Sequence, residues 1–242
     1  MNEITDSIIY ELGIETTKLL NERQGDLENI NWQNGEANID TEYSKLACDV
    51  CTIAWNRMKQ KNSKYTEIDI TCIIPDINIT FIYSDKRKSK HKIELKSSKS
   101  KKMPGSTIKK LDINQTLIYC LRPNTNSEKY KLKCSQYHSA MGYSDIDLFQ
   151  DRTPRPFLNF EKMNEIDNIL PFEKKDKNCW IEHYAKCGLK RIDNSIPCHQ
   201  SWQDDMIKII KKNILDEYIR NTTEEQFQRD KISLIIENTN IN

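Results

Sequence analysis

Residues 73–98, IIPDINITFIYSDKRKSKHKIELKSS, predict a β-hairpin and so decide the fold. Apolar and polar residues alternate along the first half, which is typical of a strand with one buried face. The apolar positions of this first strand are Ile77, Ile79 and Phe81. The second strand contains Glu94, Leu95 and Lys96. Because successive side chains of a strand point to opposite faces, Glu94 and Lys96 share one face and Leu95 lies on the other.

The register of this hairpin decides whether its two carboxylates meet. Asp76 precedes the first strand, and Glu94 lies opposite it only if the turn is centred near Asp85. The Ser84-Asp85-Lys86 segment is polar, which favours a turn at that position. We therefore expect Asp76 and Glu94 to face each other across the hairpin.

Asp76, Glu94 and Lys96 together are suited to the cleavage of a phosphodiester. Two carboxylates can hold a hard cation such as Mg²⁺, which prefers oxygen ligands. The metal makes its bound water more acidic and offsets charge on the scissile phosphate. A lysine beside the metal can orient or deprotonate the attacking water, or neutralise the phosphate. The alternative is an ordinary amphipathic hairpin with a solvated charged face.

Pro75-Asp76 with Glu94-x-Lys96 resembles the motif of the PD-(D/E)XK nuclease superfamily, which includes many type II restriction endonucleases. The resemblance covers about residues 41–121. It implies an α/β fold with a restriction-endonuclease-like mixed β-sheet flanked by helices. It also implies that Asp76 and Glu94 ligate Mg²⁺ and that Lys96 serves the nucleophile. The expected function is that of a Mg²⁺-dependent endodeoxyribonuclease acting on double-stranded DNA as a sequence-specific type II restriction endonuclease, and the family's habit suggests a homodimer.

The residues before the hairpin fit the opening order of that family, which is helix, strand and hairpin. Residues 41–60 have apolar positions at helical spacing, and residues 67–74 predict a strand. In several restriction enzymes of this type a Glu on the first helix joins the metal site, and Glu42 is the candidate here. The alternative is that Glu42 is only a first-turn acid that interacts favourably with the helix dipole.

Residues 109–121, KKLDINQTLIYCL, are consistent with either a helix or a buried strand. Gln115-x-x-x-Tyr119 resembles a motif of the exonuclease branch of the same superfamily, where it lies on the helix after the catalytic strand and supports the site. On a helix, residues four apart share a face. The apolar run at 117–120 fits a buried strand equally well.

Charge is distributed unevenly along the chain, although the formal net charge is only +1. Residues 1–45 contain ten acidic and three basic residues, whereas residues 85–110 contain two acidic and eleven basic residues. A basic run around a candidate metal site is the electrostatic footprint of a phosphate-backbone partner, although a solvated lysine-rich loop has the same composition. The candidate DNA contacts in this run and in a proline-containing loop region at 135–160 are Lys99, Lys101, Lys102, Arg152 and Arg155.

The length of 242 residues suits one large domain, or one core with an appendage. We expect residues 1–40 to form a helix and a loop packed on the core, and residues 41–242 to form a single nuclease-like domain with a helical C-terminal part. One C-terminal helix is predicted over residues 201–220. No run approaches the roughly 18–20 apolar residues of a membrane span, and the N-terminus lacks a signal-peptide pattern. We therefore expect an intracellular protein that does not contact a membrane.

The eight cysteines are expected to be reduced thiols, because no secretory signal precedes them. Cys48-x-x-Cys51 lies within a predicted helix and lacks a second pair at zinc-ribbon spacing, which favours a packing role. A second cluster could share one face of a helix and bind zinc, or could belong to a packed helix. Its members on the shared face are Cys179, His183 and Cys187, and Cys198 or His199 could supply a fourth ligand.

Two other functions remain open from the sequence. A repair or recombination nuclease could use the same fold and site, and the dependence of its cleavage pattern on DNA sequence would distinguish it from a restriction enzyme. A non-catalytic DNA-binding or scaffold protein could carry the motif by accident. That second possibility predicts that Asp76 and Glu94 lie far apart in the folded chain.

Overall fold

The computed structural model describes several segments of the chain. They are residues 4–32, 41–106, 112–125, 127–141, 156–165, 168 and 170–176, with 209, 212–213, 215–226 and 228–230 beyond them. The chain divides into two compact units, residues 1–187 and 188–242. In the second unit, residues 215–220 of the predicted C-terminal helix are described and are helical. The first unit contains the sheet and the N-terminal helix together.

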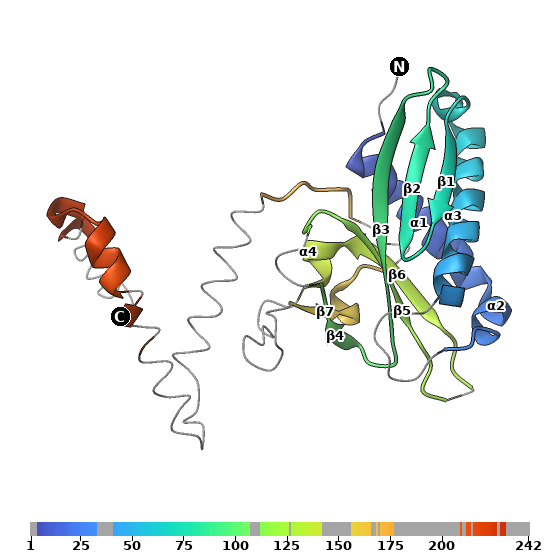
Figure 1. Ribbon diagram of the computed structural model, residues 1–242. Coiled ribbons are helices and arrows are strands. Elements are labelled where there is room, and N and C mark those ends of the chain that lie inside the picture. The colour runs from blue at the N-terminus through green and yellow to red at the C-terminus, as the bar shows by residue number, and fades with distance from the viewer. Residues whose placement is uncertain are drawn as a thin grey trace. The chain divides into compact units, whose positions relative to one another are not determined.

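A five-stranded mixed sheet forms the centre of the first unit (Figure 1). Its strands, in spatial order, are β1 (Asp69–Ile73), β2 (Ile77–Ile82), β3 (Lys88–Ser98), β5 (Thr116–Leu121) and β6 (Lys131–Gln136). The first three strands pair antiparallel, β3 and β5 are parallel, and β6 returns antiparallel to β5. The predicted α/β class, with a mixed sheet flanked by helices, is therefore confirmed.

Helices α1 (Asp6–Glu22) and α3 (Thr41–Lys61) cover one face of this sheet, and Figure 1 shows both on the same side of the strands. A short helix α2 (Gln24–Glu28) follows α1, and the 3₁₀ turn η1 (Ser63–Tyr65) follows α3. The alternate residues of β2 face the helices and are fully buried, as the sequence pattern predicted. These residues are Ile77, Ile79 and Phe81.

A second, smaller core lies on the opposite face, over β5 and β6. It includes Leu117 and Tyr119 of β5, which pack with Tyr137, Leu158 and Phe160. These partners belong to α4 (Tyr137–Ala140), to β7 (Phe157–Asn159), which pairs with β4 (Lys102–Pro104), and to the 3₁₀ turn η4 (Phe160–Lys162). Because β5 is central and covered on both faces, its residues are apolar without alternation.

The strand at 116–121 resolves the ambiguity of residues 109–121, and the helical interpretation is wrong there. β5 lies between β3 and β6, and its first five residues are buried. A fully buried strand has the same continuous apolar run as a buried helix, so periodicity could not separate them. Gln115 and Tyr119 therefore do not lie on a helix, although side chains four apart on an extended chain also point to the same side.

Gly13 marks the closest approach of α1 to the sheet, and its replacement is expected to destabilise the protein. A Cβ atom at Gly13 would lie 2.5 Å from Thr116 Cγ2 and 3.1 Å from Cys134 Sγ. Overpacking of this kind costs about 1–3 kcal/mol, which exceeds the gain of about 1 kcal/mol in helix propensity. Urea unfolding of Gly13→Ala should show the loss. Gly25→Ala is the matched control, since nothing lies within 4 Å of a Cβ there, and its stability should not decrease.

Candidate functional site

The hairpin formed by β2 and β3 has the register that brings Asp76 opposite Glu94. Ile77 pairs with Ile93 in the antiparallel ladder. Asp76, which precedes Ile77, therefore faces Glu94, which follows Ile93, at the open end of the hairpin. At the closed end Lys86 N donates to Tyr83 O at 2.8 Å, and Lys86 has a φ of 68°. The turn is thus centred on Asp85, as the polar sequence predicted.

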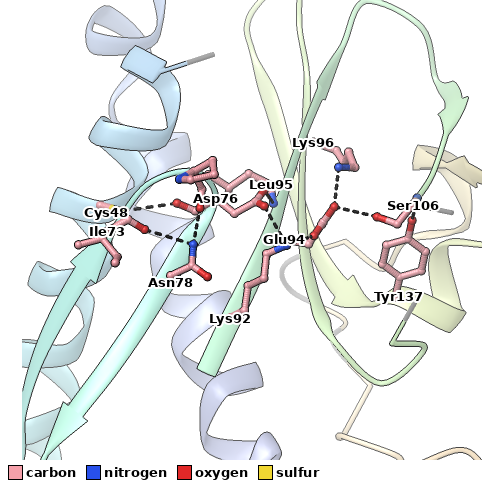
Figure 2. A network of polar contacts seen from close by, with 11 residues as sticks. Cys48, Ile73, Asp76, Asn78, Lys92, Glu94, Leu95, Lys96, Ser106 and Tyr137 are labelled. Atoms are coloured by element: carbon pink, nitrogen blue, oxygen red, sulfur yellow. Dashed lines mark hydrogen bonds and ion pairs between the residues drawn. The ribbon is translucent and has the colours of Figure 1, made fainter. Parts of the chain in front are cut away.

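Two hydrogen bonds to Asp76 and one to the preceding Pro75 fix the turn between β1 and β2 (Figure 2). The Asp76 φ of 58° is left-handed, a conformation that aspartate tolerates better than most residues. Leu95 N donates to Asp76 Oδ1 at 2.9 Å, which ties the carboxylate to β3. Cys48 Sγ on α3 donates to the Asp76 carbonyl at 3.6 Å, and Asn78 Nδ2 donates to Pro75 O at 2.5 Å. The carboxylate is therefore positioned by the sheet and by the helix behind it.

Glu94 is a buried carboxylate whose two oxygens are both hydrogen-bonded. Its residue is only 4 % exposed. Oε1 accepts from Lys96 Nζ at 2.5 Å and from Ser106 Oγ at 3.0 Å, and Oε2 accepts from Lys92 Nζ at 2.6 Å. Ser106 is held in turn, since its backbone N donates to Tyr137 Oη at 2.5 Å (Figure 2). The second core thus supports the carboxylate from one side.

The ammonium group of Lys92 lies between the two carboxylates. Its Nζ is 2.9 Å from Asp76 Oδ2 and 2.6 Å from Glu94 Oε2. The sequence-based prediction missed this residue, although it stands at the same two-residue spacing before Glu94 as Lys96 stands after it. A single cation in the site therefore contacts both acids at once.

Electrostatic interactions within this cluster keep Glu94 and Lys92 charged. Burial alone would raise the pKa of the Glu94 carboxyl, but Lys96 and Lys92 outweigh burial, and the pKa lies below its ordinary value. Burial alone would lower the pKa of Lys92, but Glu94 and Asp76 outweigh it, and that pKa is raised. The buried carboxylate and the ammonium beside it are thus held together as ions.

The depressed pKa of Glu94 predicts a loss of stability in acid. A carboxyl whose pKa is lower in the folded state contributes stability above its ordinary pKa, and that stability is lost as pH falls through the folded pKa. The free energy of unfolding, measured with urea at several pH values, should therefore fall below about pH 5. Glu94→Gln should show a smaller fall over the same range. Equal falls in both proteins would contradict this account of Glu94.

The donor set fits a small divalent cation. One oxygen of Asp76 and one of Glu94 converge on the same point, which the Lys92 ammonium occupies. Mg²⁺ is commonly held by one or two carboxylates while its other positions go to water and substrate phosphate. Over the described residues, no group of three or more His, Cys, Asp and Glu side chains could hold a metal. Two carboxylates are thus the protein ligands that this site offers.

The structure does not bring Glu42 to this pair of carboxylates. Glu42 lies exposed in the first turn of α3, and its Oε2 accepts from the backbone N of Asn31 at 2.8 Å. It is therefore a first-turn acid that also binds a neighbouring backbone donor, which was the alternative interpretation. The expectation of a third ligand at Glu42 is not supported.

Tyr119 and Gln115 lie near the site, but neither contacts its carboxylates in a described hydrogen bond. Tyr119 is the neighbour of Lys96 in the parallel pairing of β3 and β5, and its hydroxyl donates to Ser100 O at 2.7 Å. Burial raises the pKa of Tyr119 to about 12, so the phenol remains a neutral donor. Gln115 lines a pocket of about 290 Å³ together with Lys90 and Lys92. Tyr119 thus helps to hold the chain after β3 beside the site.

Of the five residues predicted to contact DNA, the structure describes three. Lys99, Lys101 and Lys102 are exposed at the end of β3 and the start of β4, and Lys101 forms an ion pair with Glu161 at 2.5 Å. Arg152 and Arg155 lie outside the described residues.

Of the cysteines with a predicted role, only Cys48 and Cys51 lie among the described residues. Cys48 and Cys51 are buried free thiols within α3, as a packing role requires. The possible zinc ligands Cys179, His183, Cys187, Cys198 and His199 lie outside the described part of the chain. No helix among the described residues is both long and apolar enough to cross a membrane.

Comparisons with known proteins give no relative for this chain. No family model matches the sequence, and neither the search of curated proteins nor the search of solved structures found a match. A functional assignment therefore depends on the geometry of Asp76, Glu94, Lys92 and Lys96.

Proposed function

We propose that this protein is a Mg²⁺-dependent endodeoxyribonuclease of the PD-(D/E)XK type with a restriction-endonuclease-like fold. It hydrolyses phosphodiester bonds of double-stranded DNA, as a sequence-specific type II restriction endonuclease. One observation carries the proposal. Asp76 and Glu94 both contact the same nitrogen of Lys92, at 2.9 and 2.6 Å, and Lys96 contacts Glu94 from the other side.

In this proposal Asp76 and Glu94 hold Mg²⁺ in place of the Lys92 ammonium. Bound Mg²⁺ supplies a Lewis acid for the phosphate and lowers the pKa of a coordinated water. Asp76 is held in place by Leu95 N, and Glu94 by Ser106, so both carboxylates are oriented before a metal arrives. This preorganisation lowers the cost of reaching the productive geometry.

Lys96 serves the attacking water in the proposed mechanism. Its ammonium is 2.5 Å from Glu94 Oε1, and its side chain is 22 % exposed. It therefore stands at the edge of the site, where a substrate phosphate and a water molecule can reach it. A lysine there can orient the nucleophile and offset the charge that develops on the phosphate.

The order of elements supports the same proposal. Helix α3, strand β1 and the hairpin β2–β3 follow one another in the order that the resemblance implies. The pairing of β3 with a parallel β5 gives the mixed sheet. Gln115 directly precedes strand β5 and Tyr119 lies within it, whereas the exonuclease branch has these two residues on a helix. The resemblance to that branch is therefore weaker. This difference favours an endonuclease.

The same distances weaken the alternative that this is a non-catalytic DNA-binding or scaffold protein in which the motif arose by accident. It predicts that Asp76 and Glu94 lie far apart, whereas both contact one ammonium nitrogen. The restriction assignment follows from the resemblance of the Asp76, Glu94 and Lys96 motif, and the 242 residues contain no Gly-rich phosphate loop of the kind that serves nucleotide-driven translocation. A two-fold symmetric DNA target would favour a homodimer.

Incubation of the purified protein with several unmethylated DNAs, in Mg²⁺ or in EDTA, tests the proposal. Discrete fragments that require Mg²⁺ are expected. A metal-dependent smear would replace restriction by a repair or recombination role on the same site. No cleavage of any substrate by a folded protein would overturn the nuclease proposal.

A further inference from the structure

A row of lysines runs along β3 on the same face as the candidate site. Side chains two residues apart on a strand share a face, so Lys88, Lys90 and Lys92 lie on the face of Glu94 and Lys96. The residues between them lie on the face that α1 and α3 cover. Lys88 and Lys90 are exposed, and neither has an ion-pair partner among the described residues. Their charges are therefore free to bind an anion.

Polar residues and one isoleucine, Ile82 opposite Lys88, surround this row on β2, while Asp6 and Asp112 line a pocket beside Lys90 and Lys92. In the register of the sheet, Thr80 lies opposite Lys90, and Asn78 lies opposite Lys92. On β1, Thr71 lies opposite Thr80 and is exposed. We call this surface of β1, β2 and β3 the open face.

The acids near the far end of the open face already have cationic partners. Asp69 binds Lys59 at 2.9 Å, and Asp85 in the turn binds Arg87 at 2.6 Å. Neither acid therefore neutralises Lys88 or Lys90. The open face is a positively charged and hydrogen-bonding surface that leads directly to the carboxylate pair.

The spacing of the row suits a DNA backbone. Two residues of a strand span about 6.7 Å, and each nucleotide of B-form DNA advances about 3.4 Å along the axis. For a duplex whose axis runs parallel to β3, each lysine step therefore corresponds to an advance of about two nucleotides along that axis. Lys90 and Lys88 stand about 13 and 20 Å along β3 from Glu94, or about four and six nucleotides.

We propose that the open face binds the phosphate backbone of the DNA duplex on one side of the cut, with Lys88 and Lys90 each neutralising a phosphate. This inference rests on the proposed nuclease function, because it takes its occupant from the reaction at Asp76 and Glu94. With a divalent cation held by Asp76 and Glu94, Lys92 would be displaced from both carboxylates and would join the row on the same face. The partner is recognised by its phosphate spacing and charge, so this contact adds affinity without sequence preference.

Binding measured in EDTA tests the inference separately from cleavage. The double variant Lys88→Ala/Lys90→Ala is compared with wild type over a range of KCl concentrations, on duplexes of two unrelated sequences. Loss of two phosphate contacts should reduce the slope of log K against log salt by about 1.8 and weaken binding to both sequences alike. In Mg²⁺ the variant should show a raised KM with little change in kcat. Lys64→Ala/Lys129→Ala removes the same charge from exposed positions outside β3 and should keep the wild-type slope.

The outcomes separate this inference from the function on which it rests. An unchanged slope and affinity in Lys88→Ala/Lys90→Ala, in a protein that cleaves DNA, would overturn the open-face inference and leave the nuclease proposal standing. An equal loss in the control variant would also overturn it, because net charge alone would then explain binding. A wild-type protein that shows the expected slopes but cleaves no DNA in Mg²⁺ would overturn the nuclease proposal.

Discussion

Lys96→Ala is expected to lower the rate of Mg²⁺-dependent DNA cleavage by about 10³-fold. The ammonium of Lys96 contacts Glu94 at the edge of the site, and no other described lysine except Lys92 contacts that carboxylate. Its removal takes away the group that orients the water and offsets developing charge. Single-turnover cleavage rates at saturating Mg²⁺ measure the effect without interference from product release.

Two further variants make this result specific. Lys96→Arg keeps the charge but changes its shape and proton-transfer properties, so its rate should remain far below that of wild type. Lys64→Ala, at an exposed position in η1, should cleave at the wild-type rate. If Lys96→Ala cleaved DNA as fast as wild type, Lys96 would have no part in catalysis.

Asp76→Asn is expected to abolish detectable Mg²⁺-dependent cleavage, a loss of about 10³-fold or more. Asparagine has the same shape, tolerates the left-handed backbone at this position, and can still accept the hydrogen bond from Leu95 N. The charge and the contact with the Lys92 ammonium are lost, but Lys92 keeps its ion pair with Glu94, so the fold and the binding of DNA in EDTA should be retained. Cleavage and binding measured on the same duplex separate these two effects.

The control for Asp76→Asn is Asp26→Asn, which removes an exposed carboxylate that binds Arg23 on the surface of α2. That variant should cleave DNA normally. A cleaving Asp76→Asn protein would mean that this carboxylate does not hold the metal.

The hairpin was predictable because its determinants are local. Alternation fixed which residues of β2 and β3 face the helices, and the polar turn around Asp85 fixed the register that pairs positions 76 and 94. The role of Lys92 was missed although its spacing was visible. Whether its ammonium reaches both acids depends on the turn that carries Asp76, which lies on another part of the chain.

Two other questions were left open by the sequence because their answers depend on tertiary packing. The helix that begins at Thr41 was predictable from periodicity, but the direction of Glu42 depends on the segment near Asn31. Residues 116–121 are buried on both faces, and a sequence without alternation cannot distinguish a central strand from a helix. The second core around Tyr137 and Leu158 joins residues far apart in the sequence, and no local pattern indicates it.

The affinity of the protein for a divalent cation, without DNA, tests the central claim most directly. Mn²⁺ is a suitable probe, because carboxylates bind it as they bind Mg²⁺ and its binding can be followed by electron paramagnetic resonance. Wild type should bind Mn²⁺, Glu94→Gln should lose that binding, and Lys92→Met should bind about tenfold more tightly, a change of about 1.4 kcal/mol, because no ammonium competes for the carboxylates. If Glu94→Gln bound Mn²⁺ as wild type does and Lys92→Met showed no gain, the two carboxylates would not form a metal site.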